Sequence, residues 1–280
     1  MTGTDLQGPL LLDLPRDVVE HYELGNEHLR LERGRNRLEF VRTCEIIEGR
    51  LPAAPDVIID VGGGTGRYAH RLADLGYAVQ LVDPISGHVQ QAQQWPSASG
   101  QLQATLGDAR ALPVASESAG AVLELGPLYH LLESADRALC LREAYRVLRP
   151  GGVVFAVSIN RFVCPLQGVF LKLFQDPVYV ELALTDLATG RHLPPPGSNY
   201  FATAYFHRPE ELADEVAAAG FEVEALLAVE GPFWLLPNFD DVWSDPSLRD
   251  HLLDLSRRFA AEPTLLGASC HVLCIGRKPG

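Results

Sequence analysis

Short apolar runs rich in β-branched residues recur along the chain, separated by longer stretches with helical periodicity. The runs cover residues 57–59, 78–82, 102–106, 119–125, 153–158, 221–229 and 269–275. Continuous apolar runs of this length are typical of strands buried on both faces, as in parallel sheets. Strands that alternate with helices favour an α/β fold. We therefore predict a doubly wound, seven-stranded, mostly parallel sheet with helices on both faces, in which the last strand is antiparallel and lies beside the sixth.

Helical stretches extend the chain beyond this sheet. A stripe over residues 40–51 precedes the first strand, and another helix is predicted over residues 135–149, where a Pro-Gly-Gly sequence would break it. We predict a helical N-terminal lid segment over residues 1–55 and a main domain over residues 56–280. Residues 160–207 are predicted to be an insertion that forms a cap.

The predicted cap has a pattern of its own. Leu166, Val169, Phe170 and Leu173 are spaced as one helical stripe, and aromatic residues gather after a Pro-Pro-Pro-Gly break. Clustered aromatics fit a substrate-binding cap, and they equally fit an ordinary small core under a long excursion of the chain. The sequence leaves both interpretations open. The candidate substrate-binding residues are Asn160, Arg161, Tyr200, Tyr205, Phe206 and His207.

A glycine-rich turn follows the first predicted strand. Asp60 ends the strand, the glycines 62, 63, 64 and 66 follow, and Thr65 is a candidate cap for the next helix. Glycines let the backbone turn sharply and approach a ligand with no Cβ in the way. The second strand ends in Asp83, about twenty residues later, where an acid can accept hydrogen bonds from ribose hydroxyls. The turn and Asp83 together predict a site for a ribose-containing ligand.

The spacing of the glycines in the turn distinguishes between the candidate ligands. A dinucleotide fingerprint needs a third glycine where this chain has Arg67, and no P-loop lysine is present. The turn instead resembles the D/E-x-G-x-G-x-G motif of the class I S-adenosylmethionine (SAM) methyltransferases. The string LREAYRVLRPGGVVFAVSI also resembles that family's helix–PGG–strand unit. The resemblance covers residues 57–158 closely and residues 209–277 loosely.

The resemblance implies a cofactor, SAM, with S-adenosylhomocysteine as its product. Asp108 follows the third strand, where family members often have an acid that reads the adenine amino group; an ordinary turn aspartate is the alternative. The charged stretch 22–37 is either a solvated face rich in ion pairs or a lid in which Tyr22 touches the ligand and one arginine holds its carboxylate. The candidate cofactor-binding residues are Tyr22, Asp60, Gly62, Gly63, Gly64, Gly66, Asp83, Pro84, His88, Asp108, Ala109, Arg110, Leu125 and Gly126.

The segment after the fourth strand is where cofactor and acceptor should meet, because ligands of doubly wound sheets bind at the carboxyl ends of the strands. It lacks the N/D-P-P-Y/F motif of DNA and protein-amide methyltransferases and resembles small-molecule members instead. His130 is the candidate general base and Tyr129 the next candidate. A histidine here could also orient the acceptor or cap the following helix.

Net charge, apolar run length and cysteine content limit the kinds of partner and location that we expect. The 280 residues carry a formal net charge of −13 and no long basic run, so we expect no nucleic-acid partner. We expect no membrane span, because the apolar runs fall short of the roughly 18 residues that a span needs. Five scattered cysteines and a start that does not read as a signal peptide favour a cytoplasmic protein with reduced thiols. No metal site is expected, and the oligomeric state is open, with a homodimer as one candidate.

The function implied is methyl transfer from SAM to a small-molecule acceptor, most simply at oxygen or nitrogen. Two alternatives stay open. One is an enzyme of the same fold with non-transfer chemistry, such as a cyclase or decarboxylase. The other is a non-catalytic SAM-binding partner protein. A nicotinamide-dependent enzyme is a more distant candidate.

Overall fold

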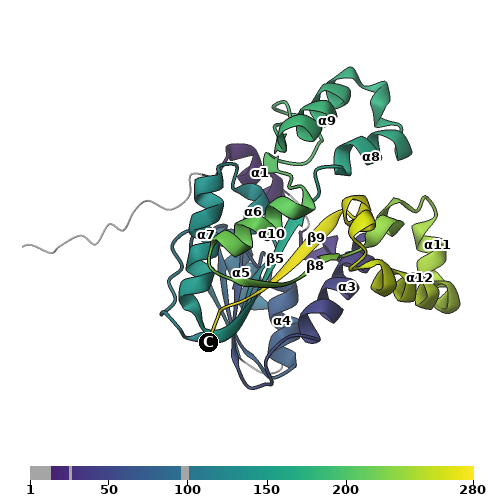
Figure 1. Ribbon diagram of the computed structural model, residues 1–280. Helices are drawn as coiled ribbons and strands as arrows, with labels where there is room; N and C mark the ends of the chain where they lie inside the picture. Colours follow the sequence, from purple (N-terminus) through teal and green to yellow (C-terminus); the bar gives the residue numbers. More distant parts are fainter. Residues whose placement is uncertain (1–13, 25–26, 96–100) are drawn as a thin grey trace, which may run out of the picture.

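A computed structural model describes residues 14–24, 27–95 and 101–280, and its centre is one seven-stranded sheet (Figure 1). The four neighbouring pairs among β1 to β5 are parallel, as predicted, while β9 is antiparallel to both β5 and β8. The strand order β3-β2-β1-β4-β5-β9-β8 confirms the predicted doubly wound fold, including the place of the last strand. The strands are β1 (Val57–Val61), β2 (Ala78–Asp83), β3 (Leu102–Leu106), β4 (Ala119–Glu124), β5 (Leu148–Ile159), β8 (Glu222–Ala228) and β9 (His271–Arg277).

Helices cover both faces of the sheet and create two separate cores. Successive strand residues point to opposite faces, so Ile58 packs into one core and Ile59 into the other. The first core is closed by α3 (Asn36–Glu48), α4 (Arg67–Asp74) and α5 (Ser86–Gln94). The second is closed by α7 (Ser134–Val147) and α10 (Pro209–Ala218). Both cores meet at β1 and β4, which are therefore buried on both faces, as their apolar runs predict.

Two local predictions are wrong. The helix predicted over residues 135–149 ends at Val147, and the Pro-Gly-Gly sequence lies inside β5, where Gly151 takes a φ of +78°. Gly151 and Gly152 therefore belong to the first part of β5 and do not end the helix. Thr65 does not cap the next helix: the N-cap position is held by Gly66 at a φ of +87°, a conformation that favours glycine.

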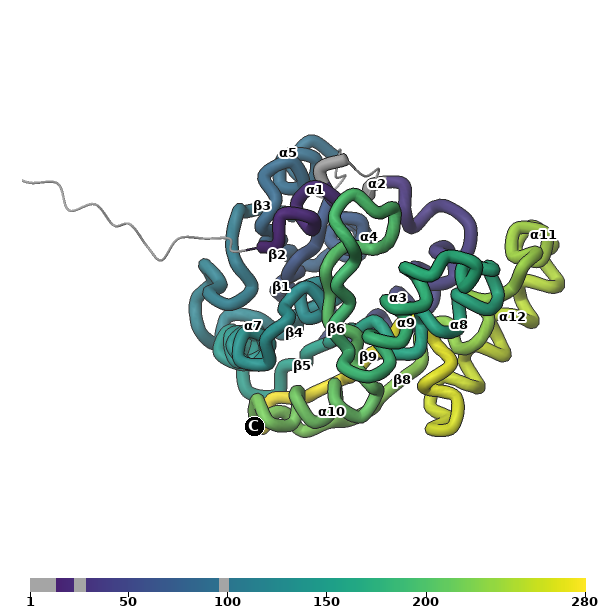
Figure 2. Tube along the Cα trace, turned by 90° about the horizontal axis from the view of Figure 1, so that it is seen from above, coloured from purple at the N-terminus to yellow at the C-terminus, as the bar shows by residue number. Residues whose placement is uncertain are grey.

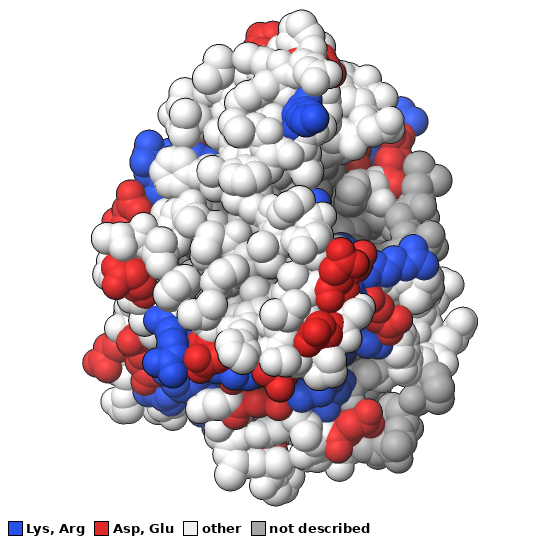
Figure 3. Space-filling view, turned by 90° about the vertical axis from the view of Figure 1, so that its right-hand side faces the viewer, with Lys and Arg blue, Asp and Glu red and all other residues white. Residues whose placement is uncertain are grey.

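The insertion forms a separate layer beside the carboxyl ends of the strands (Figure 1). It contains α8 (Val163–Phe170), the 3₁₀ turn η1 (Leu173–Gln175), α9 (Pro177–Thr189) and a small hairpin of β6 (Arg191–His192) and β7 (Ala204–Tyr205). The predicted stripe on α8 is wrong, because Val169 and Phe170 are exposed while Val163 and Cys164 are buried. On the face shown in Figure 3 the cap is largely uncharged, and acidic and basic side chains intermingle below it.

The N-terminal helix α1 (Arg16–Leu24), which precedes the short α2 (Glu27–Arg30), packs against this cap. The Thr203 amide donates a 2.7 Å hydrogen bond to Asp17 Oδ2, and the rings of His21 and Phe201 meet edge to face with centroids 5.2 Å apart. Figure 2 shows α1 beside the chain that leads into β7. We call α1 together with the cap, residues 160–207, the covering layer. Residues 1–13 and 25–26 of the predicted lid lie outside the described residues.

The remaining helices and 3₁₀ turns follow β4 or lie between β8 and β9 in the chain. They are α6 (Pro127–His130), η2 (Gly231–Leu235), α11 (Phe239–Ser244), α12 (Pro246–Phe259) and η3 (Pro263–Ala268). Within the described ranges, every helix is too short or too polar to cross a lipid bilayer.

Candidate active site

A cavity opens at the carboxyl ends of β1, β2 and β4, under α1. Its volume, counted out to its mouth, is about 1080 Å³. The structure gathers around it every predicted cofactor-binding residue except Gly66, together with both candidate catalytic residues. The lining includes Tyr22, Asp60, Gly62, Gly63, Gly64, Asp83, Pro84, His88, Asp108, Ala109, Arg110, Leu125, Gly126, Tyr129 and His130.

The glycine turn is fixed by close contacts on both sides. The Gly62 amide donates to the Val82 carbonyl at 2.7 Å, which ties the turn to β2, and Gly62 and Gly64 have φ values of +64° and +57°. At Gly63 the constraint is steric: a Cβ there would lie 2.6 Å from Asp60 Oδ2 and 2.8 Å from Leu81 Cδ1. Asp60 therefore supports the turn from below. Gly66 has a different role, since it begins α4 rather than lining the cavity.

Two carboxylates lie under this turn in unlike environments. Asp83 Oδ2 accepts the Gly64 amide at 2.8 Å, and its Oδ1 accepts the Ile85 amide at 2.9 Å and lies 3.2 Å from His88 Nδ1. Asp60 is buried, and among the described residues its Oδ2 has no hydrogen-bond partner. Burial, with the neighbouring charge of Asp83, raises the pKa of Asp60 to about 7. A cationic ligand in the cavity would favour the charged form of Asp60.

Asp108 lines the cavity as predicted, but its carboxylate already has a partner. Both of its oxygens contact the Arg110 guanidinium, at 2.7 Å in the shortest bond, and Oδ1 also accepts the Arg110 amide at 2.8 Å. Burial raises the pKa of Asp108, but these bonds outweigh it and the net pKa is lowered. Arg110 lies 3.3 Å from Asp136 as well. The pair fixes the turn after β3 and leaves Asp108 charged.

Two arginines also line the cavity. Of the arginines in the charged stretch 22–37, Arg30 is on the lining, where it makes a bidentate ion pair with Glu39 at 2.8 and 3.0 Å. Arg35 instead donates to the Trp234 carbonyl. Arg67 also lines the cavity and pairs with Glu32 at 2.8 Å. Sequence reasoning missed Arg67 as a site residue, although it occupies the place of the dinucleotide motif's third glycine.

His130 faces the covering layer. Its Nε2 lies 2.8 Å from the Tyr22 hydroxyl, and its Nδ1 lies 3.4 Å from the Thr203 carbonyl. Burial lowers the pKa of His130 to about 4, so its ring is neutral at pH 7. A carbonyl only accepts, so the proton belongs on Nδ1 and the Nε2 lone pair accepts from Tyr22. Tyr129 is buried next to it, with ring centroids 4.7 Å apart.

The six predicted substrate-binding residues are not on the cavity lining. Arg161 is buried and pairs with Glu211 at 2.6 Å, and Tyr205 and His207 join the same network through Glu211 and Glu215. Asn160 is buried and donates to the Leu266 carbonyl. Phe206 is part of the cap's core, with Tyr200 at its margin. These contacts hold the cap together and join it to α10 and η3, which agrees with the small-core interpretation of the aromatics.

Comparison with known proteins agrees with this geometry. Residues 58–152 match the family model described as a methyltransferase domain. Over these residues the chain is similar to the class I SAM-dependent methyltransferases, and its sheet has the fold of that family. One relative, an uncharacterized methyltransferase of Mycobacterium tuberculosis (strain ATCC 25618 / H37Rv), is 38% identical over 39% of this chain and 42% of its own length. A ubiquinone biosynthesis O-methyltransferase of Azorhizobium caulinodans is 31% identical over 60% of each chain.

The solved structures extend the likeness beyond the matched segment. A Thermotoga maritima SAM-dependent methyltransferase, titled a possible histamine N-methyltransferase, superposes with a TM-score of 0.59 at 20% identity. The match covers 92% of this chain and 98% of that one. At this identity the match shows the shared methyltransferase fold. The matched part of the chain spans about two fifths of the length of the mycobacterial relative.

The steric role of Gly63 gives a direct prediction. Gly63→Ala should destabilise the protein by about 1–3 kcal/mol, because the added methyl group overlaps Asp60 and Leu81. Gly87→Ala is the matched control: Gly87 lies in α5 with nothing within 4 Å of its added Cβ, and alanine should be neutral or stabilise by about 0.5–1 kcal/mol. Urea denaturation measures both variants. Equal free energies of unfolding for the two variants would show that Gly63 is not in close contact with Asp60 and Leu81.

Proposed function

We propose that this protein transfers a methyl group from SAM to a small-molecule acceptor at oxygen or nitrogen. The observation that carries the proposal is that one cavity reaches from the glycine turn and Asp83 to Tyr129 and His130. A cofactor bound at the turn would thus lie close to a candidate base. The names of two similar proteins favour such acceptors, since the Azorhizobium protein is a ubiquinone biosynthesis O-methyltransferase and the Thermotoga protein a possible histamine N-methyltransferase.

The residues present fit SAM. The turn at Gly62–Gly64 offers backbone without Cβ atoms, and the unpartnered Asp60 Oδ2 suits a cationic ligand. Asp83 is the proposed acceptor of the ribose hydroxyls, and Arg30 the proposed partner of the methionine carboxylate. The turn of Asp108 and Ala109 is proposed to hold the adenine. When bound, SAM would supply an electrophilic methyl group on its sulfonium.

The protein's own contribution would be to position the acceptor and exclude water. The covering layer of α1 and the cap brings the Tyr22 hydroxyl and the Thr203 carbonyl onto His130, which lines the cavity from α6. Holding the reacting atoms in attack geometry supplies much of the catalysis in such displacements. A hydroxyl or amine acceptor would compete with the Tyr22 hydroxyl for His130 Nε2 and could give up its proton there. The homodimer and the cytoplasmic location stay predictions.

The assay is a panel of small hydroxylated and aminated compounds with methyl-labelled SAM. The proposal expects label in an acceptor together with equal formation of S-adenosylhomocysteine. SAM binding without label transfer to any compound would favour the two alternatives, a cyclase- or decarboxylase-type enzyme or a binding partner protein. Conversion of a compound without consumption of SAM would single out the first of these.

Removal of the Asp83 carboxylate should weaken cofactor binding. Asp83→Ala is expected to lose roughly 1.5–3 kcal/mol of SAM affinity, about ten- to 150-fold, which is the range for hydrogen bonds to a charged group. Isothermal titration calorimetry measures the affinity, and Asp254→Ala on the exposed face of α12 serves as control. Unchanged affinity in Asp83→Ala would remove this residue from the ribose role.

The raised pKa of Asp60 predicts a pH-dependent affinity. Below pH 7 the carboxyl is protonated, and above pH 7 it is charged and attracts a cation. SAM affinity should therefore rise between pH 6 and pH 8, by up to about tenfold if binding requires the charged form. Asp60→Asn should lose this component while keeping any dependence that belongs to SAM itself. Identical pH profiles for the two proteins would contradict the assignment.

The riskiest prediction is that His130 is the general base. General-base catalysis typically contributes 10²–10⁴-fold, so His130→Ala should lower turnover by about that factor with SAM affinity nearly intact. His251→Ala, an exposed histidine on α12, is the matched control. A His130→Ala variant that kept more than about a tenth of the rate would show that His130 is not the base. Joint loss of SAM affinity and thermal stability would mark it as a structural residue.

A further inference from the structure

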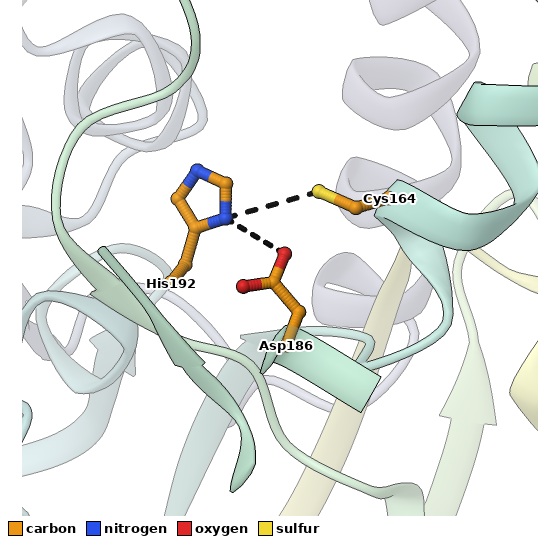
Figure 4. A group of neighbouring side chains, drawn as sticks. All are labelled: Cys164, Asp186 and His192. Carbon is orange, nitrogen blue, oxygen red and sulfur yellow. Dashed lines mark hydrogen bonds and ion pairs between the residues drawn. The ribbon is translucent and has the colours of Figure 1, made fainter. Parts of the chain in front are cut away.

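Three metal-ligating side chains meet inside the cap, away from the cavity lining. Cys164 comes from α8, Asp186 from α9 and His192 from β6, and their side chains point toward one another (Figure 4). All three residues are buried, with exposed fractions of 5%, 0% and 1%. One ligand atom from each lies within 4.8 Å of the others. His192 Nδ1 is 2.8 Å from Asp186 Oδ2 and 3.8 Å from Cys164 Sγ.

The second ring nitrogen fixes which atoms face the centre of this cluster. His192 Nε2 lies 3.2 Å from the Phe201 carbonyl. Because a carbonyl only accepts, Nε2 carries a proton, and in the neutral ring Nδ1 presents its lone pair to Asp186 and Cys164. Metal-bound histidines are typically oriented by such a bond from their other nitrogen. Two lone-pair atoms 2.8 Å apart need a cation between them or an additional proton.

A second feature points to a ligand. Asp186 Oδ1 is buried and has no hydrogen-bond partner in the part of the chain that the structure describes. Buried carboxylate oxygens are normally paired, and an unpaired one is costly. The other cluster of this type, Glu230 with Cys270 and His271, differs here. Both oxygens of Glu230 accept hydrogen bonds, from the Ser269 hydroxyl, the His271 amide and the His271 ring.

We propose that Cys164, Asp186 and His192 bind a divalent transition metal of the zinc type. The set of one thiolate, one carboxylate and one neutral imidazole carries two negative charges and would neutralise a divalent ion in the buried site. A thiolate and an imidazole on one tetrahedral zinc lie about 3.6 Å apart, close to the 3.8 Å found here. The Asp186 carboxylate is available as the oxygen ligand, since Oδ2 faces His192 Nδ1 and Oδ1 has no hydrogen-bond partner among the described residues. The ion would join α8, α9 and β6, and so hold the cap together.

This site has no signal in the sequence. Its ligands are separated by 22 and 6 residues, which is not a spacing typical of zinc motifs. The sequence therefore predicts no metal, and it is the fold of the insertion that brings the three side chains together. The proposal is independent of the proposed methyl transfer, because none of the three lines the cavity.

The test uses the full-length protein, purified, incubated with zinc and dialysed. We expect about one zinc per chain by mass spectrometry of the metal, and a lower melting temperature after a chelator removes it. Cys164→Ser and Asp186→Asn should each reduce the bound zinc at least tenfold. Cys44→Ser is the matched control, since Cys44 is a buried thiol in α3 outside the cluster, and it should keep its zinc.

Cobalt keeps the proposal testable if the variants do not fold. Wild-type protein loaded with Co²⁺ should show the absorption band of a thiolate–cobalt bond, and added zinc should abolish it. Wild-type protein that binds neither ion would overturn the proposal and leave a protonated His192–Asp186 pair. Equal zinc loss in Cys44→Ser and Cys164→Ser would overturn it as well, because the ion would then not belong to this cluster.

Discussion

The contact between the Asp60 carboxylate and Gly63 is the constraint on which the site depends. Asp60 lies in β1, where the parallel register sets Val61 opposite Val82 on one side and Glu124 on the other. That register brings the ends of β1, β2 and β4 to one edge of the sheet. The turn can pass over Asp60 because residue 63 has no Cβ. Burial of Asp60 beneath the turn also raises its pKa to about 7. The packing of the turn therefore influences whether Asp60 is charged, and so how strongly it attracts a cationic ligand.

The covering layer is the second determinant of the site. α1 and the cap are far apart in sequence, yet Asp17 binds the Thr203 amide and Tyr22 meets His130 beneath them. An acceptor that reaches His130 Nε2 must displace the Tyr22 hydroxyl. The start of the cap is joined to α10 by the ion pair between buried Arg161 and half-buried Glu211. Its geometry is therefore fixed independently of the ligand, which favours a preformed acceptor site.

The fold and most of the cavity lining could be predicted from the sequence because both follow from local patterns. Apolar runs mark buried strands, and the glycine spacing marks the turn whose backbone approaches a ligand. The substrate residues could not be predicted, because an aromatic or arginine side chain in an insertion takes its role from distant partners. Arg161 is an example, since Glu211 lies 50 residues later in the chain. Arg67 and the cluster of Cys164, Asp186 and His192 were missed for the same reason.

The most direct test of the central claim is calorimetric titration of the purified protein with SAM and, separately, with NAD. The turn has Arg67 where a dinucleotide site needs a third glycine, and Asp60 favours a cationic ligand. We expect saturable binding of one SAM per chain and no binding of NAD. Binding of NAD together with no binding of SAM would contradict the assignment of the cavity.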